Sequence, residues 1–316
     1  MNIGKIGIWT GLLDSQPAAK AQAAVASLEA LGYGAVWIPE SRGRESFTHS
    51  GLLLAGTRRL VVATGITNLY GRDPVAMAQA QRALAEAYPE RFLLGIGVSH
   101  RPSVEGIRGH RYEKPLSTMR AYLDAMDAAL FMAAPPATEP PRVLAALRPK
   151  MLALSAERSW GAHPYFVPVE HTALARKIMG NGPLLAPEQA VVLETDPGRA
   201  RKIARAHTRR YLGLENYANN LRWLGFTDDD LADAGSDRLV DAVVAWGDLE
   251  AIAARVRAHL AAGADHVCVQ VLTADMARTP VVTATAEAAG GAPRGIGPIP
   301  LPEREWRELA PALLAL

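Results

Sequence analysis

The apolar run RFLLGIGVSH, residues 91–100, passes through two glycines and ends on a serine and a histidine. Such a run is typical of a buried strand that delivers Ser99 and His100 to one edge of a sheet. A neutral imidazole can give or take a proton near pH 7, so His100 is a candidate for proton transfer. The alternative is a loop histidine that is hydrogen-bonded for structure, and position alone does not decide between the two.

A carboxylate ends a second apolar run, VWIPE at residues 36–40. Glu40 could hydrogen-bond a bound ligand, or it could be the structural partner of a basic side chain such as Arg42 or Arg44. Its place at the end of a predicted strand favours the ligand-binding role. Ser41 follows directly and is expected at the same edge.

The composition indicates a soluble, globular chain, and its charge balance predicts a small-molecule partner. Of its 316 residues, 49% are hydrophobic and 21% are charged, so a large core can be buried. The 34 basic and 32 acidic residues leave a formal charge of +2, and no basic block of the kind found in nucleic-acid-binding proteins occurs. No segment resembles a signal peptide or offers the roughly 20 apolar residues of a membrane span. We therefore expect a cytoplasmic protein.

Several side chains are expected to be structural. The single cysteine, Cys268, lies within the apolar run HVCVQVL and is expected to be a buried strand thiol, with no disulfide and no zinc cluster. Trp9 and Trp37 lie in strand-like segments and are expected in the core. His163 is expected to be a hydrogen-bonded histidine of the same interior.

Strand-like and helix-like segments alternate along nearly the whole chain, which predicts repeated βα units around a parallel sheet. The predicted strands span residues 5–11, 35–40, 59–67, 91–97, 143–147, 163–168, 187–194 and 265–272. The predicted helices span residues 16–32, 46–57, 74–88, 114–132, 149–158, 197–212, 248–262 and 303–315, with an insertion of short helices at about 213–247 and a Gly- and Pro-rich loop at 279–302. The prediction is an α/β fold, a single (β/α)8 TIM barrel over residues 1–316 with a helical insertion after the seventh strand.

A doubly wound open sheet is the alternative fold. A dinucleotide-binding fingerprint would need a third glycine where His100 stands in GIGVSH, and no such motif follows the first predicted strand. Gly95 and Gly97 instead indicate a close approach of the backbone to some other group. The barrel is therefore favoured.

In a barrel, active sites lie at the carboxyl ends of the strands. This face would receive Trp9, Thr10, Glu40, Ser41, residues 65–68, 97–100, 145–148 and 167–170, and Gln270. The histidines show no HxH or HExxH spacing for a metal, and no GxSxG hydrolase elbow occurs. Since few groups could do difficult chemistry alone, a bound cofactor is expected.

The block GITNLYGRDPVAMAQAQRALAEAYPERFLLGIGVSH, residues 65–100, resembles the bacterial luciferase-like superfamily and, within it, the branch that uses the deazaflavin coenzyme F420. The pattern G-[IV]-T-N-x-Y-x-R-x-P at 65–74 is especially similar to methylenetetrahydromethanopterin reductase and its actinobacterial relatives. VWIPE, AALRPKMLALSAERSWG (145–161) and AGADHVCVQVL (262–272) support the resemblance, which covers residues 5–272.

The resemblance implies a barrel that binds a flavin-like ring at the carboxyl face and passes hydride to or from the deazaflavin C5. In relatives, a cis peptide without proline at the end of the third strand supports the ring, and here that bond would be Gly65–Ile66. The tail phosphate of relatives lies at the ends of the fourth and fifth strands. The implied cofactor-binding residues are Gly65, Ile66, Thr67, Asn68, Gly97, Val98, Ser99, Ala145, Ala146, Leu147 and Arg148, and Glu40 falls where relatives have an acid that hydrogen-bonds the ring.

The sequence departs from one part of this branch. Sugar-phosphate dehydrogenases place a histidine after the second-strand acid and a glutamate after the fourth-strand glycines, where this chain has Ser41 and His100. The catalytic candidates are therefore His100, as acid or base, with Glu40 and Ser41. The leading hypothesis is a homodimeric, F420-dependent oxidoreductase acting on a small organic substrate. The alternatives are an FMN-dependent monooxygenase and a non-catalytic flavin-binding barrel.

Overall fold

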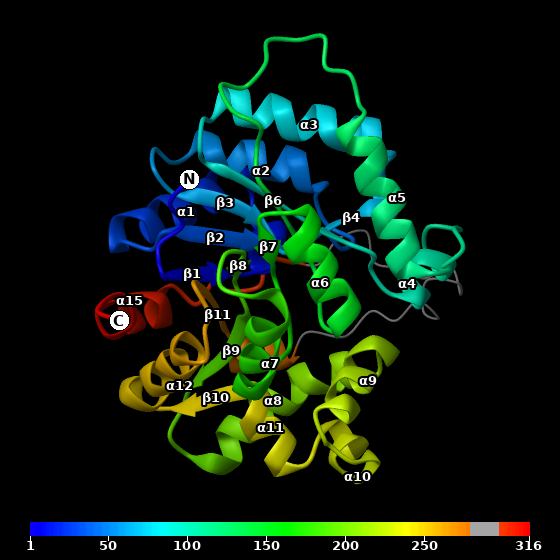
Figure 1. The fold of residues 1–316 in the computed structure, drawn as a ribbon. Coiled ribbons are helices and arrows are strands. Elements are labelled where there is room, and N and C mark those ends of the chain that lie inside the picture. Colours follow the sequence, from blue (N-terminus) through cyan, green and yellow to red (C-terminus); the bar gives the residue numbers. More distant parts are fainter. Residues whose placement is uncertain (279–296) are drawn as a thin grey trace.

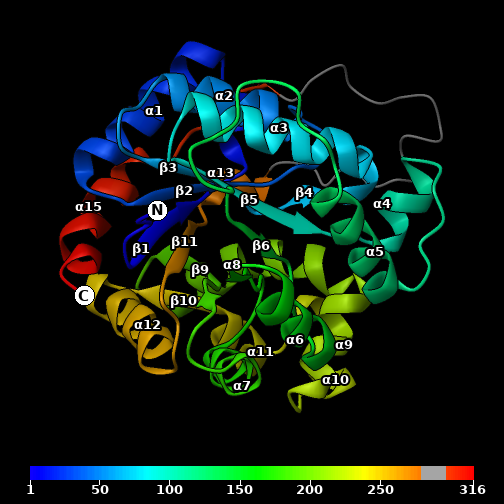
Figure 2. The same cartoon turned by 45° about the horizontal axis from the view of Figure 1, so that its top comes forward.

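The computed structural model describes residues 1–278 and 297–316, so most of the predicted loop 279–302 lies outside the described residues. A parallel sheet curls into a barrel and helices cover its outer face (Figures 1 and 2). The strands are β1 (Ile6–Trp9), β2 (Ala35–Ile38), β3 (Val61–Thr64), β4 (Thr67–Asn68), β5 (Phe92–Gly97), β6 (Arg142–Leu144), β7 (Gly161–Ala162), β8 (Leu184–Leu185), β9 (Glu188–Leu193), β10 (Val244–Gly247) and β11 (Val267–Val271). The predicted barrel-type α/β fold is confirmed.

The helices follow the predicted alternation with three additions. They are α1 (Ala18–Leu31), α2 (Ser46–Ala55), α3 (Pro74–Ala87), α4 (Arg101–Gly106), α5 (Pro115–Asp127), α6 (Pro149–Arg158), α7 (Val169–Met179), α8 (Pro197–Leu212), α9 (Glu215–Trp223), α10 (Asp228–Leu231), α11 (Asp237–Val243), α12 (Leu249–Ala261), α13 (Ala274–Arg278) and α15 (Glu303–Leu314). The prediction lacked α4, α7 and α13. Local sequence accounts for several ends: Asp73 caps α3, and Gly32 ends α1 at a φ of 99°, which suits glycine.

The barrel closes through one chain segment, residues 184–193, which contains β8 and β9. The sheet order is β10-β9-β11-β1-β2-β3-β5-β6-β7-β8. Ala186 donates its N–H to the carbonyl of Ala162 on one side (2.9 Å), and Pro187 accepts from the N–H of Cys268 on the other (2.9 Å). The same segment thus joins β7 to β11 and brings all the strand carboxyl ends to one mouth.

Two segments differ from the prediction. In place of the predicted strand 163–168, the structure has a two-residue strand just before it, Gly161–Ala162. The strand does not continue because a proline such as Pro164 has no N–H to donate to a neighbouring strand. The predicted helical insertion 213–247 ends in a strand, Val244–Gly247, which pairs with β9. Val244 and Trp246 favour extended backbone where β9 offers an edge.

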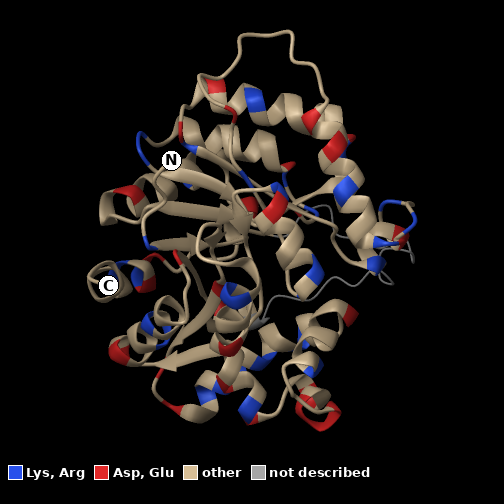
Figure 3. Cartoon of the chain, viewed as in Figure 1, with Lys and Arg blue, Asp and Glu red and all other residues tan. Residues whose placement is uncertain are grey.

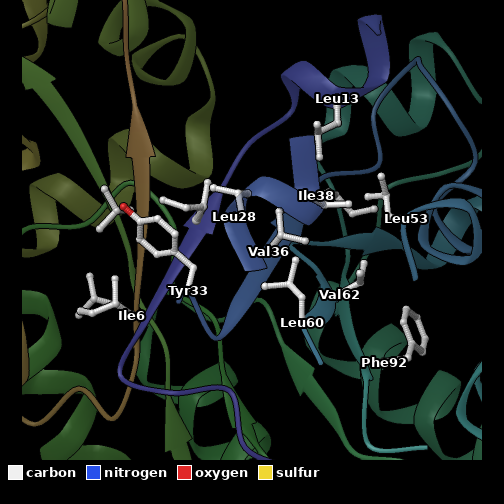
Figure 4. Packing of buried hydrophobic residues seen from close by; sticks show 14 of the residues in the cluster. Ile6, Leu13, Leu28, Tyr33, Val36, Ile38, Leu53, Leu60, Val62 and Phe92 are labelled. Carbon is white, nitrogen blue, oxygen red and sulfur yellow. The ribbon is translucent and has the colours of Figure 1, made fainter. Parts of the chain in front are cut away.

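Among the described residues the core has two large parts, one on each face of the curled sheet, and a smaller cluster around Leu152, Ala162 and Leu185. Figure 4 shows the outer part, in which Val36 and Ile38 from β2 point toward Leu28 and Leu53 of the covering helices. The inner part fills the barrel with side chains such as Trp9, Trp37, Ala63, Leu93 and Cys268. The expected burial of the two tryptophans and of the Cys268 thiol is confirmed.

Charged residues lie mainly on the helices and connecting segments, while the barrel strands carry few of them (Figure 3). Within the described parts of the chain, no helix combines the length and the apolar character needed to cross a bilayer.

Candidate active site

The chain between β3 and β4 turns through a cis peptide bond between Gly65 and Ile66. The predicted cis bond is confirmed. Gly65 donates its N–H to the carbonyl of Ile38 (2.8 Å), and Ile66 accepts from the N–H of Glu40 (3.1 Å). The bulge is therefore tied to the carboxyl end of β2, at the mouth of the barrel.

Two aromatic side chains lie directly behind this bulge. A Cβ atom on Gly65 would lie 2.6 Å from Trp9 Nε1 and 2.9 Å from His163 Nε2, so glycine is needed there. Trp9 Nε1 donates to the carbonyl of Gly65 (3.2 Å). His163 stacks on Trp37, and its Nδ1 donates to the carbonyl of Ala186 (2.7 Å), while Nε2 has no partner. Burial lowers the pKa of His163 to about 4, so its ring is neutral near pH 7.

The glycines of β5 leave room for the bulge between β3 and β4. A Cβ atom on Gly95 would lie 2.0 Å from the carbonyl oxygen of Thr64, and one on Gly97 would lie 2.5 Å from Ile66 Cδ1 and 3.2 Å from Ala145 Cβ. The close approach expected at these glycines is confirmed, and the group that approaches is the segment between β3 and β4. Ile66, Gly97 and Ala145 thus form one packed surface across neighbouring strand ends.

The side chain of Glu40 is buried, and both of its carboxylate oxygens have partners within the chain. Its Oε2 accepts from the N–H of Asn68 (2.8 Å) and from Arg72 Nη1 (3.2 Å). Its Oε1 accepts from the N–H and the hydroxyl of Ser46 (both 3.3 Å) and pairs with Arg72 Nη2. The side chains of Glu40 and Arg72 are only 5% and 12% exposed. Arg72 is a basic partner of Glu40, where the sequence had suggested Arg42 or Arg44.

The other predicted residues near β2 and β4 have different surroundings. Ser41 is exposed and lines an open hollow of about 550 Å³ with Tyr70, Arg108 and other side chains. The hydroxyl of Thr67 lies 2.9 Å from that of Ser46 and is buried. Asn68 Oδ1 accepts from the N–H of Tyr70 (2.9 Å). Thr67 Oγ1 and Asn68 Oδ1 therefore already have partners in the chain.

His100 stands where β5 leads into α4, after Val98 and after Ser99, which has a φ of 56°. Its Nδ1 lies 2.8 Å from the Oδ1 of Asn216 in α9. Because this oxygen can only accept, Nδ1 carries the hydrogen, and Nε2 of the neutral ring is left to accept a proton. Burial lowers the pKa of His100, and the bond to Asn216 opposes that shift. Near pH 7 the ring is a neutral base.

The segment after β6 leads into the N-terminus of α6. Ala145 and Leu147 are half-buried, Ala146 is buried and Arg148 is exposed. His171 Nε2 donates to the carbonyl of Leu147 (2.6 Å) and so holds this turn in place. Arg148 immediately precedes α6 and its side chain does not cap the helix. A helix N-terminus beside an exposed guanidinium suits a phosphate group.

Sequence reasoning missed a cluster of polar and aromatic side chains at the mouth. The hydroxyl of Tyr165 lies 2.8 Å from the hydroxyl of Tyr211 and 2.8 Å from Gln270 Oε1. Tyr217 of α9 packs against both tyrosines, and Glu188 is buried at the start of β9. The available signal was Glu188 itself, a charged residue at the start of a strand that is apolar after Gln189. The described residues contain no cluster of three or more His, Cys, Asp or Glu side chains suited to a metal.

Residues 5–266 match the luciferase-like monooxygenase family. A Mycobacterium tuberculosis protein, named as a coenzyme F420-dependent oxidoreductase, is 26% identical over 337 aligned positions, which cover 87% of this chain and 97% of the relative. Both findings agree with the resemblance seen in the sequence.

Two solved structures share the fold. An F420-dependent secondary alcohol dehydrogenase, in complex with an F420-acetone adduct, has a TM-score of 0.69 at 14% identity, over 85% of this chain and 94% of that one. The oxygenating constituent of 3,6-diketocamphane monooxygenase from Pseudomonas putida, in complex with FMN, has a TM-score of 0.66 at 15% identity, over 98% of both chains. The expected enzyme class, an oxidoreductase, is confirmed. Because the family match extends over most of its length, the chain belongs to the luciferase-like monooxygenase family.

Proposed function

We propose that the protein is an oxidoreductase that uses coenzyme F420 and exchanges a hydride between the deazaflavin C5 and a small organic substrate. The observation that carries the proposal is the order of three features along the barrel mouth. The Gly65–Ile66 bulge, His100 and the start of α6 follow β3, β5 and β6, which are neighbours in the sheet. Along this one edge, the support for the ring would thus be followed by a proton-transferring group and then by a phosphate-binding helix end.

The residues of this edge fit the parts of such a coenzyme. Ile66, backed by Trp9, would support the ring, and Arg148 with the N-terminus of α6 would hold the tail phosphate. The bound coenzyme would supply the hydride for reduction and accept it for oxidation. His100 Nε2 would take the proton from a substrate hydroxyl during oxidation and return it during reduction, while Asn216 holds the ring in one tautomer.

The remaining predicted residues have supporting roles in this proposal. Glu40 would act through the backbone that it holds, since it binds the N–H of Asn68 and pairs with Arg72. Ser41 is exposed at the same end of the barrel and would contact the substrate. Four other residues would line the edge of the ring and tail mainly with their backbone, namely Thr67, Gly97, Val98 and Ser99.

The second candidate is a monooxygenase that uses reduced FMN and oxygen. It is supported by the family description and by the FMN-bound neighbour, which this chain matches over 98% of both lengths. The two candidates share a fold and differ in the coenzyme that the mouth accepts.

Titration of the purified protein with F420 and with FMN, followed by fluorescence quenching, separates these candidates. Micromolar binding of F420 without binding of FMN supports the proposal. The reverse result, or binding of neither, overturns it. The cytoplasmic location and the homodimer stay predictions, and sedimentation of the purified protein would test the second.

A further inference from the structure

Arg108 carries a half-buried positive charge that has no partner among the described residues. With Tyr70 and Arg42, it lines the open hollow of about 550 Å³ beside Ser41. Across residues 1–278 and 297–316, its guanidinium makes no hydrogen bond and no ion pair. The described residues that line the hollow include no Asp or Glu. A cation that is partly withdrawn from water and lacks a counter-ion is a ready partner for an anion.

The turn that follows α4 holds the backbone of Arg108 in place. The N–H of Arg108 donates to the carbonyl of Ser103 (3.2 Å). Two residues on, the N–H of His110 donates to the carbonyl of Val104 (3.0 Å), whose side chain is fully buried. The guanidinium reaches the mouth of the barrel, because a Cβ atom on Gly71 would lie 3.3 Å from Arg108 Nη1. The charged end of the side chain is therefore presented at the mouth from a fixed backbone.

The nearby carboxylate of Glu40 does not act as the counter-ion of Arg108. Glu40 Oε2 would lie 3.4 Å from the same Cβ position on Gly71, so the two groups are neighbours. Both oxygens of Glu40 accept from Arg72, and Oε2 also accepts from the N–H of Asn68. The described chain contains no ion pair between Glu40 and Arg108. The Glu40 carboxylate is thus used within the chain, and the N–H groups of Arg108 are left for a ligand.

Two tyrosines connect the hollow with the candidate base. The ring of Tyr70, which lines the hollow, lies 6.4 Å from the ring of Tyr112. The hydroxyl of Tyr112 donates to the carbonyl of Ser99 (3.4 Å), the residue before His100. A ligand held in the hollow would therefore extend along these aromatic rings toward the end of β5.

We propose that the hollow binds a carboxylate group of the substrate and that Arg108 is the residue that binds it. The inference rests on the proposed function and narrows its substrate to a hydroxy acid or a keto acid. A planar guanidinium matches a carboxylate, because two parallel N–H groups can bond both oxygens. One guanidinium suits the single charge of a carboxylate better than the double charge of a phosphate. Proton transfer stays with His100, while Arg108 selects acids over uncharged compounds.

Isothermal titration of the coenzyme-free protein tests the hollow itself. The ligands are levulinate, which is a keto acid, and methyl levulinate, its uncharged ester. Levulinate is expected to bind, and the ester should bind roughly tenfold more weakly or worse, because it lacks the charge-assisted bonds. Arg108→Gln should weaken levulinate binding by a similar factor. The matched control is Arg111→Gln, which removes an exposed arginine of the same segment that does not line the hollow and should match the wild type.

Two results of this titration overturn the inference. One is the absence of levulinate binding, or an equal affinity in Arg108→Gln and the wild type. The other is levulinate binding that is kept in Arg108→Gln and lost in Arg148→Gln, since levulinate would then occupy the proposed site of the tail phosphate.

A second pair of measurements separates the substrate from the coenzyme. Arg108→Gln is expected to keep F420 affinity within a few fold, and a matching loss of F420 affinity would assign the hollow to the coenzyme and overturn the inference. The wild type should turn over hydroxy and keto acids with a lower KM than their esters, and Arg108→Gln should remove this difference with little effect on kcat. Equal KM values for acids and esters in the wild type would refute it. Failure of the wild type to bind F420 would instead refute the proposed function, and the levulinate titration would still decide whether the hollow binds a carboxylate.

Discussion

The Nδ1 of His100 lies 2.8 Å from the Oδ1 of Asn216, so the end of β5 is hydrogen-bonded to a helix of the insertion. This contact determines the chemistry available to His100. With its hydrogen on Nδ1, the ring presents an unprotonated Nε2, and the amide oxygen cannot reverse that choice. The insertion therefore helps to define the tautomer of the candidate base as well as covering it.

His100→Ala is expected to slow turnover by about 10² or more, because a general acid or base is lost. F420 affinity should stay within a few fold of the wild type. Steady-state kinetics and fluorescence titration measure the two effects separately, with His110→Ala as a control in the neighbouring hollow. A fall in affinity with unchanged kcat would mean that His100 is a coenzyme ligand.

Stability should fall as the medium becomes acidic. Burial lowers the pKa to about 4 for His163, His171 and His266 and to about 3 for His207 and His259, against an ordinary value of 6.5. These groups bind protons more readily in the unfolded chain, so their contribution is complete above pH 6.5 and is lost as the pH falls toward 4 and 3. Each proton taken up on unfolding contributes a slope of about 1.4 kcal/mol per pH unit.

Urea denaturation at a series of pH values measures this effect. Replacement of His259 by Gln is expected to reduce the slope below the ordinary pKa of histidine. Glu188 works in the opposite sense, because a raised carboxyl pKa costs stability as the pH rises from 4.5 toward about 8. A free energy of unfolding that stays constant from neutral pH into the acid range would contradict the buried, neutral state of these histidines.

Arg72→Met is expected to destabilise the protein by about 3–5 kcal/mol, because it leaves the buried carboxylate of Glu40 without its cation. The matched control is Arg101→Met, which removes an exposed pair with Glu105 and should cost less than about 1 kcal/mol. Chemical denaturation gives both values. Equal costs for the two variants would show that the Glu40–Arg72 pair is not held out of solvent.

Gly65→Ala should disturb the bulge through direct contact, since the added methyl group would meet Trp9 Nε1 and His163 Nε2. We expect a loss of about 1–3 kcal/mol in stability and a loss of F420 affinity. Gly182→Ala is the control, because a Cβ atom there has no neighbour within 4 Å. If Gly65→Ala binds F420 as the wild type does, the ring is not supported by this bulge.

The alternation of strands and helices could be predicted because the spacing of hydrophobic residues and the glycines at strand ends are local signals. The Gly65–Ile66 cis bond followed from the resemblance to the family. Two kinds of feature could not be predicted from the sequence. The partners of Glu40 and His100 lie 32 and 116 residues away, and only the folded chain brings Arg72 and Asn216 to them. The end of the insertion, Val244–Gly247, becomes a strand only because β9 offers it a free edge, which tertiary structure supplies.

The pairing of β10 with β9 also limits how this enzyme could be redesigned. The segment 184–193 closes the barrel, and the insertion that carries Asn216 and Tyr217 returns to that same segment through Val244–Gly247. Grafting another insertion would therefore alter the seam of the barrel together with the lining of its mouth. A change to the residues that line the mouth would therefore also change the strand pairing that closes the barrel. A successful chimaera would have to exchange β9, the insertion and β10 together, as one continuous segment.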